Sequence, residues 1–221
     1  MHYRDLGKAA RLDRDLSGYP EEPLEVYFED NYEKSLQRRN LEDIVNFLKE
    51  WRVRVKISKR KLQRAIESKR LLLSQLRKRR INIVSVNLTD ARLHDTVVEL
   101  FDTFSKVSVG RRTYTGASKI LHVLVPDLFV MWDDTIRYAY GCRRQKEGDD
   151  SEKYFTFLKR VQLEAKEAVE SYCSEHNCTD EEAMRRIRLE LYEEGFYPFT
   201  RLVDIYNFQK YTLGKDEMWS P

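Results

Sequence analysis

The side chains best suited to chemistry gather between residues 115 and 137 of the 221-residue chain. Lys119 lies in the opening turn of an expected helix, and His122 follows three residues later on the same helix face. Asp133 and Asp134 stand at the expected start of the next helix. The positive end of a helix dipole and nearby arginines favour the neutral, nucleophilic form of a lysine. The pattern therefore indicates Lys119 as a candidate nucleophile and His122 as a proton acceptor, with Asp133 or Asp134 at a neighbouring helix start.

Each of these residues also has a purely structural interpretation. A lysine on a helix most often faces solvent, an aspartate before a helix most often caps it, and a histidine on an apolar face is most often buried and hydrogen-bonded. Trp132 and Phe129 are expected as core anchors beside Pro126 rather than as a platform for stacked bases. The spacing alone leaves catalysis and structure open.

The order of features in residues 89–141 resembles the helix-hairpin-helix DNA glycosylases. This segment predicts a helix, a basic turn with glycine, a helix that begins Gly-Ala-Ser-Lys119, and an aspartate that opens a further helix. The resemblance implies that the turn holds a DNA phosphate, that Lys119 attacks the sugar C1′ to form a Schiff base, and that Asp134, or Asp133, stabilises the developing charge. The family's Gly-x-Gly hairpin and its cysteine cluster are absent from this sequence.

A longer stretch is similar to uncharacterised prokaryotic proteins. The shared pattern reads Lys-x-Leu-His, Pro-x-x-Phe and Met-Trp-Asp, and it stands here at residues 119–122, 126–129 and 131–133. This second resemblance implies no activity.

Charge is distributed unevenly along the chain, although the formal net charge is only +3. Residues 49–80 hold 14 Lys and Arg against two acids, whereas the remainder holds 26 Lys and Arg against 35 Asp and Glu. A concentrated positive field steers a polyanion and binds it through counterion release. We therefore expect nucleic acid, DNA or RNA, as the partner, contacted by Arg60, Lys61, Arg64, Lys78, Arg79, Arg111 and Arg112.

Three functions fit these features. The first is a helical nucleic-acid-binding protein with no reaction assigned to it. The second adds chemistry at Lys119, as a DNA glycosylase or abasic-site lyase. The third is a non-enzymatic interaction module whose basic helix docks an acidic partner, or the acidic body of a second copy in a homo-oligomer. The first and the third require the same charges, so the sequence does not separate them.

Hydrophobic periodicity predicts an all-α fold, a compact orthogonal bundle of about nine helices. Residues 1–39 are expected as an irregular acidic and aromatic arm, residues 40–80 as a basic helical layer, and residues 81–221 as the all-α core. Two β-like stretches interrupt the pattern, at residues 53–57 and 81–88. Helices are expected at residues 40–51, 58–78, 89–106, 115–125, 133–140, 151–175, 179–194 and from 200 onward.

Composition excludes several classes of protein. No apolar run approaches the roughly 18 residues of a membrane span, and the first residues lack the apolar core of a signal peptide, so we expect a cytoplasmic protein. Cys142, Cys173 and Cys178 are expected to be reduced there, and with His176 they offer too few well-spaced ligands for zinc. We expect no metal and no cofactor. The charge-rich composition also suits a heat-adapted organism.

Overall fold

The computed structural model describes residues 1–15, 38–51, 53–79, 81–143, 149–191 and 197–214. Within these ranges the chain forms nine α-helices and a short π-helical turn and contains no strand, so the expected all-α fold is confirmed. The elements are α1 (Tyr3–Asp15), α4 (Arg38–Glu50), α5 (Lys59–Lys78), α6 (Ala91–Ser105), α7 (Tyr114–Leu124), α8 (Asp134–Ala139), α9 (Asp150–His176), α10 (Asp180–Leu191), α11 (Phe199–Asn207) and η1 (Phe208–Thr212).

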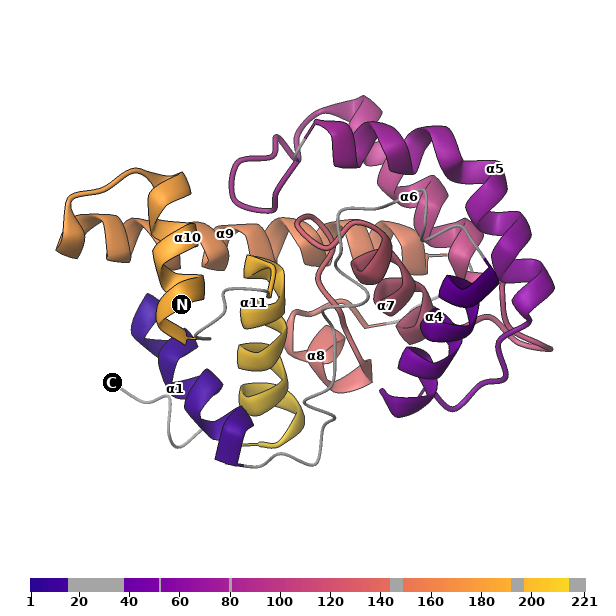
Figure 1. Ribbon diagram of the computed structural model, residues 1–221, viewed down its shortest axis with the longest axis horizontal. Helices are drawn as coiled ribbons and strands as arrows, with labels where there is room; N and C mark the ends of the chain where they lie inside the picture. The colour runs from indigo at the N-terminus through magenta and orange to yellow at the C-terminus, as the bar shows by residue number, and fades with distance from the viewer. Residues whose placement is uncertain (16–37, 52, 80, 144–148, 192–196, 215–221) are drawn as a thin grey trace.

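Helix α9 is the longest of the described helices and runs along the length of the bundle (Figure 1). Its 27 residues span about 40 Å at a rise of about 1.5 Å per residue. Helices α1 and α10 pack near one end of it, where α1 also contacts α11, and α6 packs along the other part. Helices α7, α4 and α5 continue outward from α6, so α5 forms an outer edge of the molecule (Figure 1).

The core around α9 is rich in aromatic side chains. The rings of Phe101 and Tyr154 stack with their centroids 4.3 Å apart, and the ring of Trp132 meets both of them edge-on. The hydroxyl of Tyr154 donates a hydrogen bond to the carbonyl of Val130 at 2.8 Å. Trp132 and Phe129 are fully buried, which confirms their expected role as core anchors.

The first helix, α1, corrects the expectation of an irregular arm. Residues 3–15 are helical, and Leu6, Ala9 and Ala10 on one face are buried against α9 and α11. The Asp5 carboxylate accepts a hydrogen bond from the backbone N–H of His2 at 2.8 Å, which closes the start of the helix. The rest of the expected acidic and aromatic arm, residues 16–37, lies outside the described residues, and α4 starts at Arg38.

Neither β-like stretch forms a strand in the described chain. Residues 53–57 contribute only an isolated bridge between Ile57 and Ser108. Residues 81–88 form turns in which the Asn82 side chain accepts hydrogen bonds from two backbone N–H groups, and the amide of Gln162 on α9 donates to the carbonyls of Ile83 and Val86 at 2.8 and 2.7 Å. Side chains thus supply hydrogen-bond partners for backbone groups that would pair with a neighbouring strand in a sheet.

Side-chain caps define the helices that surround the candidate site. Ser58 caps α5 as expected, by accepting a hydrogen bond from the N–H of Lys61. Helix α6 begins after Asp90, not at the expected Thr89. Thr113 caps α7 through the N–H of Gly116, and this contact requires a glycine because a Cβ at that position would clash with the threonine hydroxyl.

Candidate functional site

Five polar or aromatic side chains meet where α7, the start of α8, α11 and the end of α4 come together. We call them the Lys119 cluster: Lys119, Trp51, Asp133, Arg201 and Asp204. The ammonium of Lys119 donates a hydrogen bond to the carbonyl of Trp51 at 2.6 Å and lies 5.5 Å from the centroid of its ring. The Arg201 guanidinium lies 4.4 Å from the same ring centroid. Two cations therefore share one indole ring at this junction.

The charge of Lys119 is destabilised by its surroundings. The pKa of Lys119 is lowered from 10.5 to about 8, mainly by burial. Asp133 and Asp204 oppose the change, and the nearby Arg201 guanidinium adds to it. A pKa of about 8 leaves on the order of a tenth of the amines neutral at pH 7. A neutral amine carries the lone pair that a nucleophile needs.

Asp204 is the most deeply buried carboxyl group of the cluster. Its Oδ1 accepts a hydrogen bond from the N–H of Met131 at 2.6 Å, and its Oδ2 lies 3.4 Å from Nδ1 of His122. Burial raises the pKa of Asp204 well above its usual value, although Arg201, the Met131 N–H and Lys119 all favour the ionised form. The aspartate therefore ties α11 to the turn before α8.

His122 lies behind Lys119 and is completely buried. Its Nδ1 is 2.7 Å from the carbonyl of Phe129, and since a carbonyl only accepts, this nitrogen carries a proton. Burial lowers the pKa of His122 to about 3, so the ring is neutral at physiological pH. The arrangement holds α7 against the following turn and matches the structural interpretation of this residue.

The two adjacent aspartates point to different surroundings. Asp133 caps α8 through the N–H of Ile136 at 2.8 Å, and its second oxygen accepts a hydrogen bond from the hydroxyl of Thr212 at 2.8 Å. Asp134 has a side chain that is 76% exposed, and it pairs with Arg137 at 3.3 Å. The structure thus brings Asp133 into the field of Lys119 and leaves Asp134 at the surface.

The basic residues of the sequence divide into paired and unpaired groups. Lys59 pairs with Glu42 at 2.7 Å, Lys69 pairs with Glu99 at 2.5 Å, and Arg112 pairs with Asp102. The ammonium of Lys61 donates to the carbonyl of Ser108 at 2.9 Å. The exposed side chains of Arg60, Arg64, Lys78, Arg79 and Arg111 form no ion pair with a carboxylate within the described ranges.

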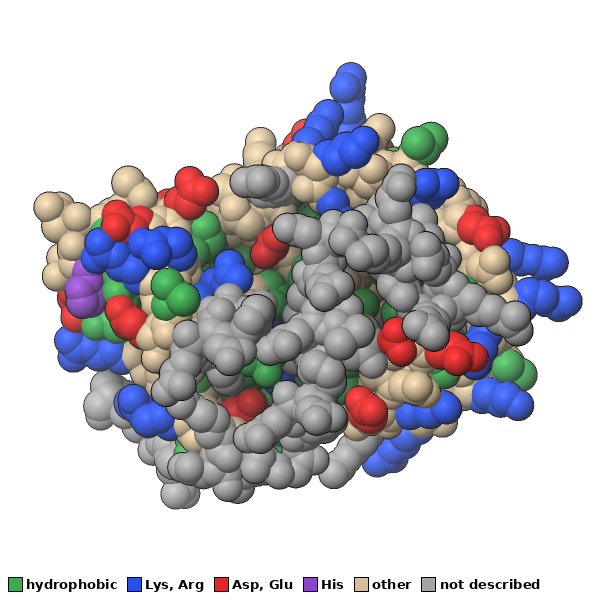
Figure 2. Space-filling view, viewed as in Figure 1, with side chains coloured by type: hydrophobic (Ala, Val, Ile, Leu, Met, Phe, Trp, Pro, Cys, Tyr) green, Lys and Arg blue, Asp and Glu red, His purple; other side chains and the backbone are tan. Residues whose placement is uncertain are grey.

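We call these last five residues the α5 surface. The N–H of Ser58 bonds to the carbonyl of Val107 at 2.9 Å, and the N–H of Val109 bonds to the carbonyl of Lys56 at 2.8 Å. These contacts hold the turn that carries Arg111 beside the start of α5. Lys and Arg side chains project along the edge of the molecule that α5 occupies (Figure 2).

Other functional groups are sparse among the described residues. No group of three His, Cys, Asp or Glu side chains is arranged to hold a metal ion in this part of the chain, and its three cysteines are free thiols. None of the described helices combines the length and apolar character needed to cross a membrane.

The sequence patterns do not indicate three members of the cluster, Arg201, Asp204 and Trp51. No local signal marks them, because the burial of all nine residues of α11, which makes its charges require internal partners, is a property of the tertiary fold. Comparison with protein-family models, with curated protein sequences and with solved structures finds no match.

Proposed function

We propose that this protein binds nucleic acid through the α5 surface. The observation that carries the proposal is a row of exposed cations on one side of α5 without carboxylate partners. At about 100° per residue, Arg60, Arg64 and Lys78 fall within about 40° of one another around the helix axis. They extend over about 27 Å, roughly the length of eight base pairs of duplex DNA.

The chemistry of this row favours contacts with phosphates. Lysine and arginine on a straight helix can each displace a counterion from a nucleic-acid backbone, and such contacts carry affinity without reading sequence. Arg111, on the adjoining turn, widens the charged surface at the start of the helix. The residues between Arg64 and Lys78 on the same face include two that are not cationic: Glu67, which accepts a hydrogen bond from Gln63 at 2.9 Å, and the exposed Leu71.

The salt dependence of binding tests the proposal. Fluorescence anisotropy with a duplex of about 24 base pairs, titrated at several KCl concentrations, gives the slope of log affinity against log salt. The slope is negative, and in the triple variant Arg60→Gln, Arg64→Gln, Lys78→Gln it should be shallower by about 3. Each lost phosphate contact reduces its magnitude by about 0.9. The variant Lys8→Gln, Arg11→Gln, Lys159→Gln removes the same charge from exposed positions on α1 and α9 and serves as the control.

Two results would contradict binding through α5. One is no detectable affinity for duplex or single-stranded DNA or RNA at about 50 mM salt, and the other is an equal change of slope in the two triple variants. A salt-sensitive dimer without affinity for nucleic acid would instead support the interaction-module alternative.

The lowered pKa of Lys119 favours a second candidate, an abasic-site lyase. The neutral amine would add to the C1′ aldehyde of an abasic sugar and release water as the imine forms, and Asp133 would stabilise the positive charge of the protonated imine. Borohydride reduction should then trap a covalent adduct with abasic DNA. Lys119→Arg retains the charge and should abolish the adduct, whereas Lys159→Arg on α9 should not. An adduct that survives in Lys119→Arg places the nucleophile elsewhere.

A further inference from the structure

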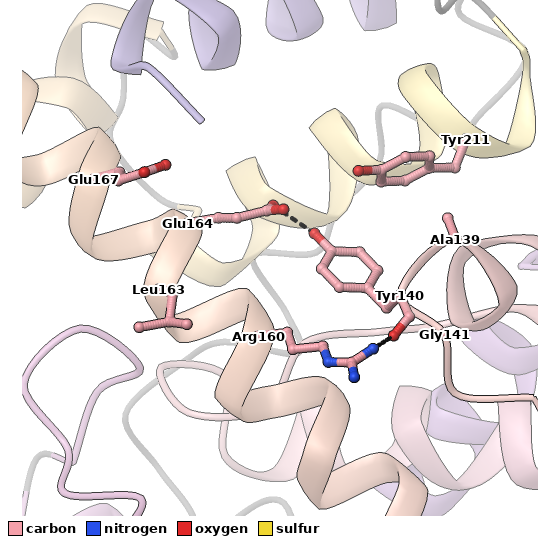
Figure 3. A pocket seen from close by; sticks show the side chains of 8 residues that line it. All are labelled: Ala139, Tyr140, Gly141, Arg160, Leu163, Glu164, Glu167 and Tyr211. Atoms are coloured by element: carbon pink, nitrogen blue, oxygen red, sulfur yellow. Dashed lines mark hydrogen bonds between the residues drawn. The ribbon is translucent and has the colours of Figure 1, made fainter.

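A hollow of about 450 Å³ opens where the end of α8, the middle of α9 and η1 meet (Figure 3). Two tyrosine rings, Tyr140 and Tyr211, and two carboxylates, Glu164 and Glu167, line it. Leu163, which is 65% exposed, adds an aliphatic wall from α9. None of these residues belongs to the Lys119 cluster or to the α5 surface, so the hollow is a separate feature.

The carboxylate of Glu164 is held in place from the protein interior. The hydroxyl of buried Tyr140 lies 2.5 Å from Oε2 of Glu164 and 2.8 Å from Oδ1 of Asn207. A phenol has one proton to donate, whereas the buried amide NH2 of Asn207 has no partner among the described residues. Turning the Asn207 amide over satisfies both groups: its NH2 donates to Tyr140, and Tyr140 donates to Glu164. Burial and the charge of Glu164 raise the pKa of Tyr140, so the phenol keeps its proton.

The cation best placed to neutralise Glu164 is engaged elsewhere. Arg160 precedes Glu164 by four residues on α9, the spacing at which ion pairs form on helices. Its guanidinium instead donates to the backbone carbonyl of Tyr140 (Figure 3). This approach depends on Gly141, which has a φ of +65° and whose Cβ would lie 2.7 Å from Nη1 of Arg160. Glu164 therefore forms no ion pair with any cation in the described part of the chain.

A carboxylate beside aromatic rings and an alkyl wall suits an organic cation. The carboxylate accepts charge-assisted hydrogen bonds, the ring faces attract positive charge, and Leu163 can cover an alkyl chain. The same chemistry is already present at the edges of the hollow. Oε2 of Glu167 lies 2.6 Å from the α-ammonium of Met1, and the ammonium of Lys210 lies 5.1 Å from the ring centroid of Tyr211.

We propose that this hollow binds an alkylammonium ion, with Glu164 as the charged contact and Tyr211 as the aromatic wall. The cation arrives either free, as a polyamine, or as the lysine side chain of another polypeptide. Both sources present a primary ammonium group on a flexible carbon chain.

Calorimetric titration with n-butylammonium chloride tests the proposal, and butyrate and 1-butanol are ligand controls with a negative charge and no charge. We expect saturable binding of n-butylammonium and no binding of butyrate. Glu164→Gln keeps an acceptor for the Tyr140 hydroxyl but removes the charge, and it should weaken binding at least tenfold. Glu170→Gln removes a charge from an exposed position on the same helix, outside the hollow, and should change binding less than twofold.

Equal binding of n-butylammonium and 1-butanol, or unchanged binding in a folded Glu164→Gln variant, would overturn the proposal. Circular dichroism establishes whether the variant is folded, and if it is not, the comparison of the three butyl probes on the unaltered protein decides. Spermidine and Nα-acetyl-lysine methylamide then distinguish the two sources. Binding of spermidine at least tenfold more tightly identifies a free polyamine, and the converse identifies a lysine side chain.

Discussion

Replacing Lys119 with methionine tests whether the Lys119 cluster holds an unfavourable charge. In the folded chain the pKa of Lys119 is about 8, compared with 10.5 for an ordinary lysine, because burial disfavours the ammonium. Between these two pH values the unfolded chain therefore binds more protons than the folded one at this position. The contribution of Lys119 to the free energy of unfolding therefore becomes more favourable as the pH rises across that interval.

The size of the effect follows from the two pKa values. The difference between 10.5 and about 8, at about 1.36 kcal/mol for each tenfold change in proton affinity, corresponds to about 3 kcal/mol. This cost is fully present below pH 8 and disappears by about pH 10.5. Methionine has no ammonium but loses the hydrogen bond to the Trp51 carbonyl, worth about 1 kcal/mol. We expect Lys119→Met to be about 2 kcal/mol more stable than the parent at pH 7.

Urea denaturation followed by circular dichroism at several pH values between about 7 and 10.5 provides the measurement. The stability of the parent relative to Lys119→Met should increase by about 3 kcal/mol over this range. Tyrosines that titrate there are common to both proteins and cancel in the difference. Lys8→Met, at an exposed lysine on α1, should show no such pH dependence. A constant difference between the parent and Lys119→Met across the whole range would refute the reasoning.

Two further predictions concern the neighbours of Lys119. Because burial lowers the pKa of His122 to about 3, the unfolded chain binds the extra proton between pH 6.5 and 3, and stability falls as the pH falls. In His122→Gln, denaturation between pH 7 and 4 should show less acid sensitivity than in the parent, and an unchanged pH profile would contradict the assignment. Asp133→Ala removes a helix cap and the bond to Thr212, so its thermal unfolding should reveal a loss of about 1–2 kcal/mol. Asp134→Ala is the matched control, and a loss of comparable size there would show that the cap is misassigned.

Helix α5 shows what periodicity predicts well. The residues expected to face inward are all buried: Leu62, Ala65, Ile66, Leu73 and Leu76. An amphipathic pattern over five turns determines which face of the helix packs against the core. The cap at its start was also predictable, since a serine directly before such a pattern is a local signal.

Helix α1 and residues 81–88 show where local patterns fail. The buried face of α1 is small, with Leu6, Ala9 and Ala10 beside Gly7, and the helix is short, so its helical state depends on packing against α9 and α11. Residues 81–88 alternate like a strand, but a strand requires a partner, and the described chain supplies turns with side-chain acceptors and donors instead.

The candidate site was predictable only where its members share one segment of sequence. Lys119 and Asp133 stand close together in the chain, and the sequence indicated both. Trp51, Arg201 and Asp204 come from helices on either side of that segment, and only the tertiary fold brings them to it. No spacing rule predicts such a meeting from a single sequence.

The side-chain amide of Gln162 connects α9 to residues 81–88, the segment that follows α5. Its two hydrogen bonds fix the segment that follows α5, so a neutral group far from the charged row in sequence contributes to holding the end of that helix in place. A leucine at this position would leave two buried carbonyls without donors. The segment after α5 would then be attached less firmly to the body of the molecule, while every charge of the basic edge remained in place.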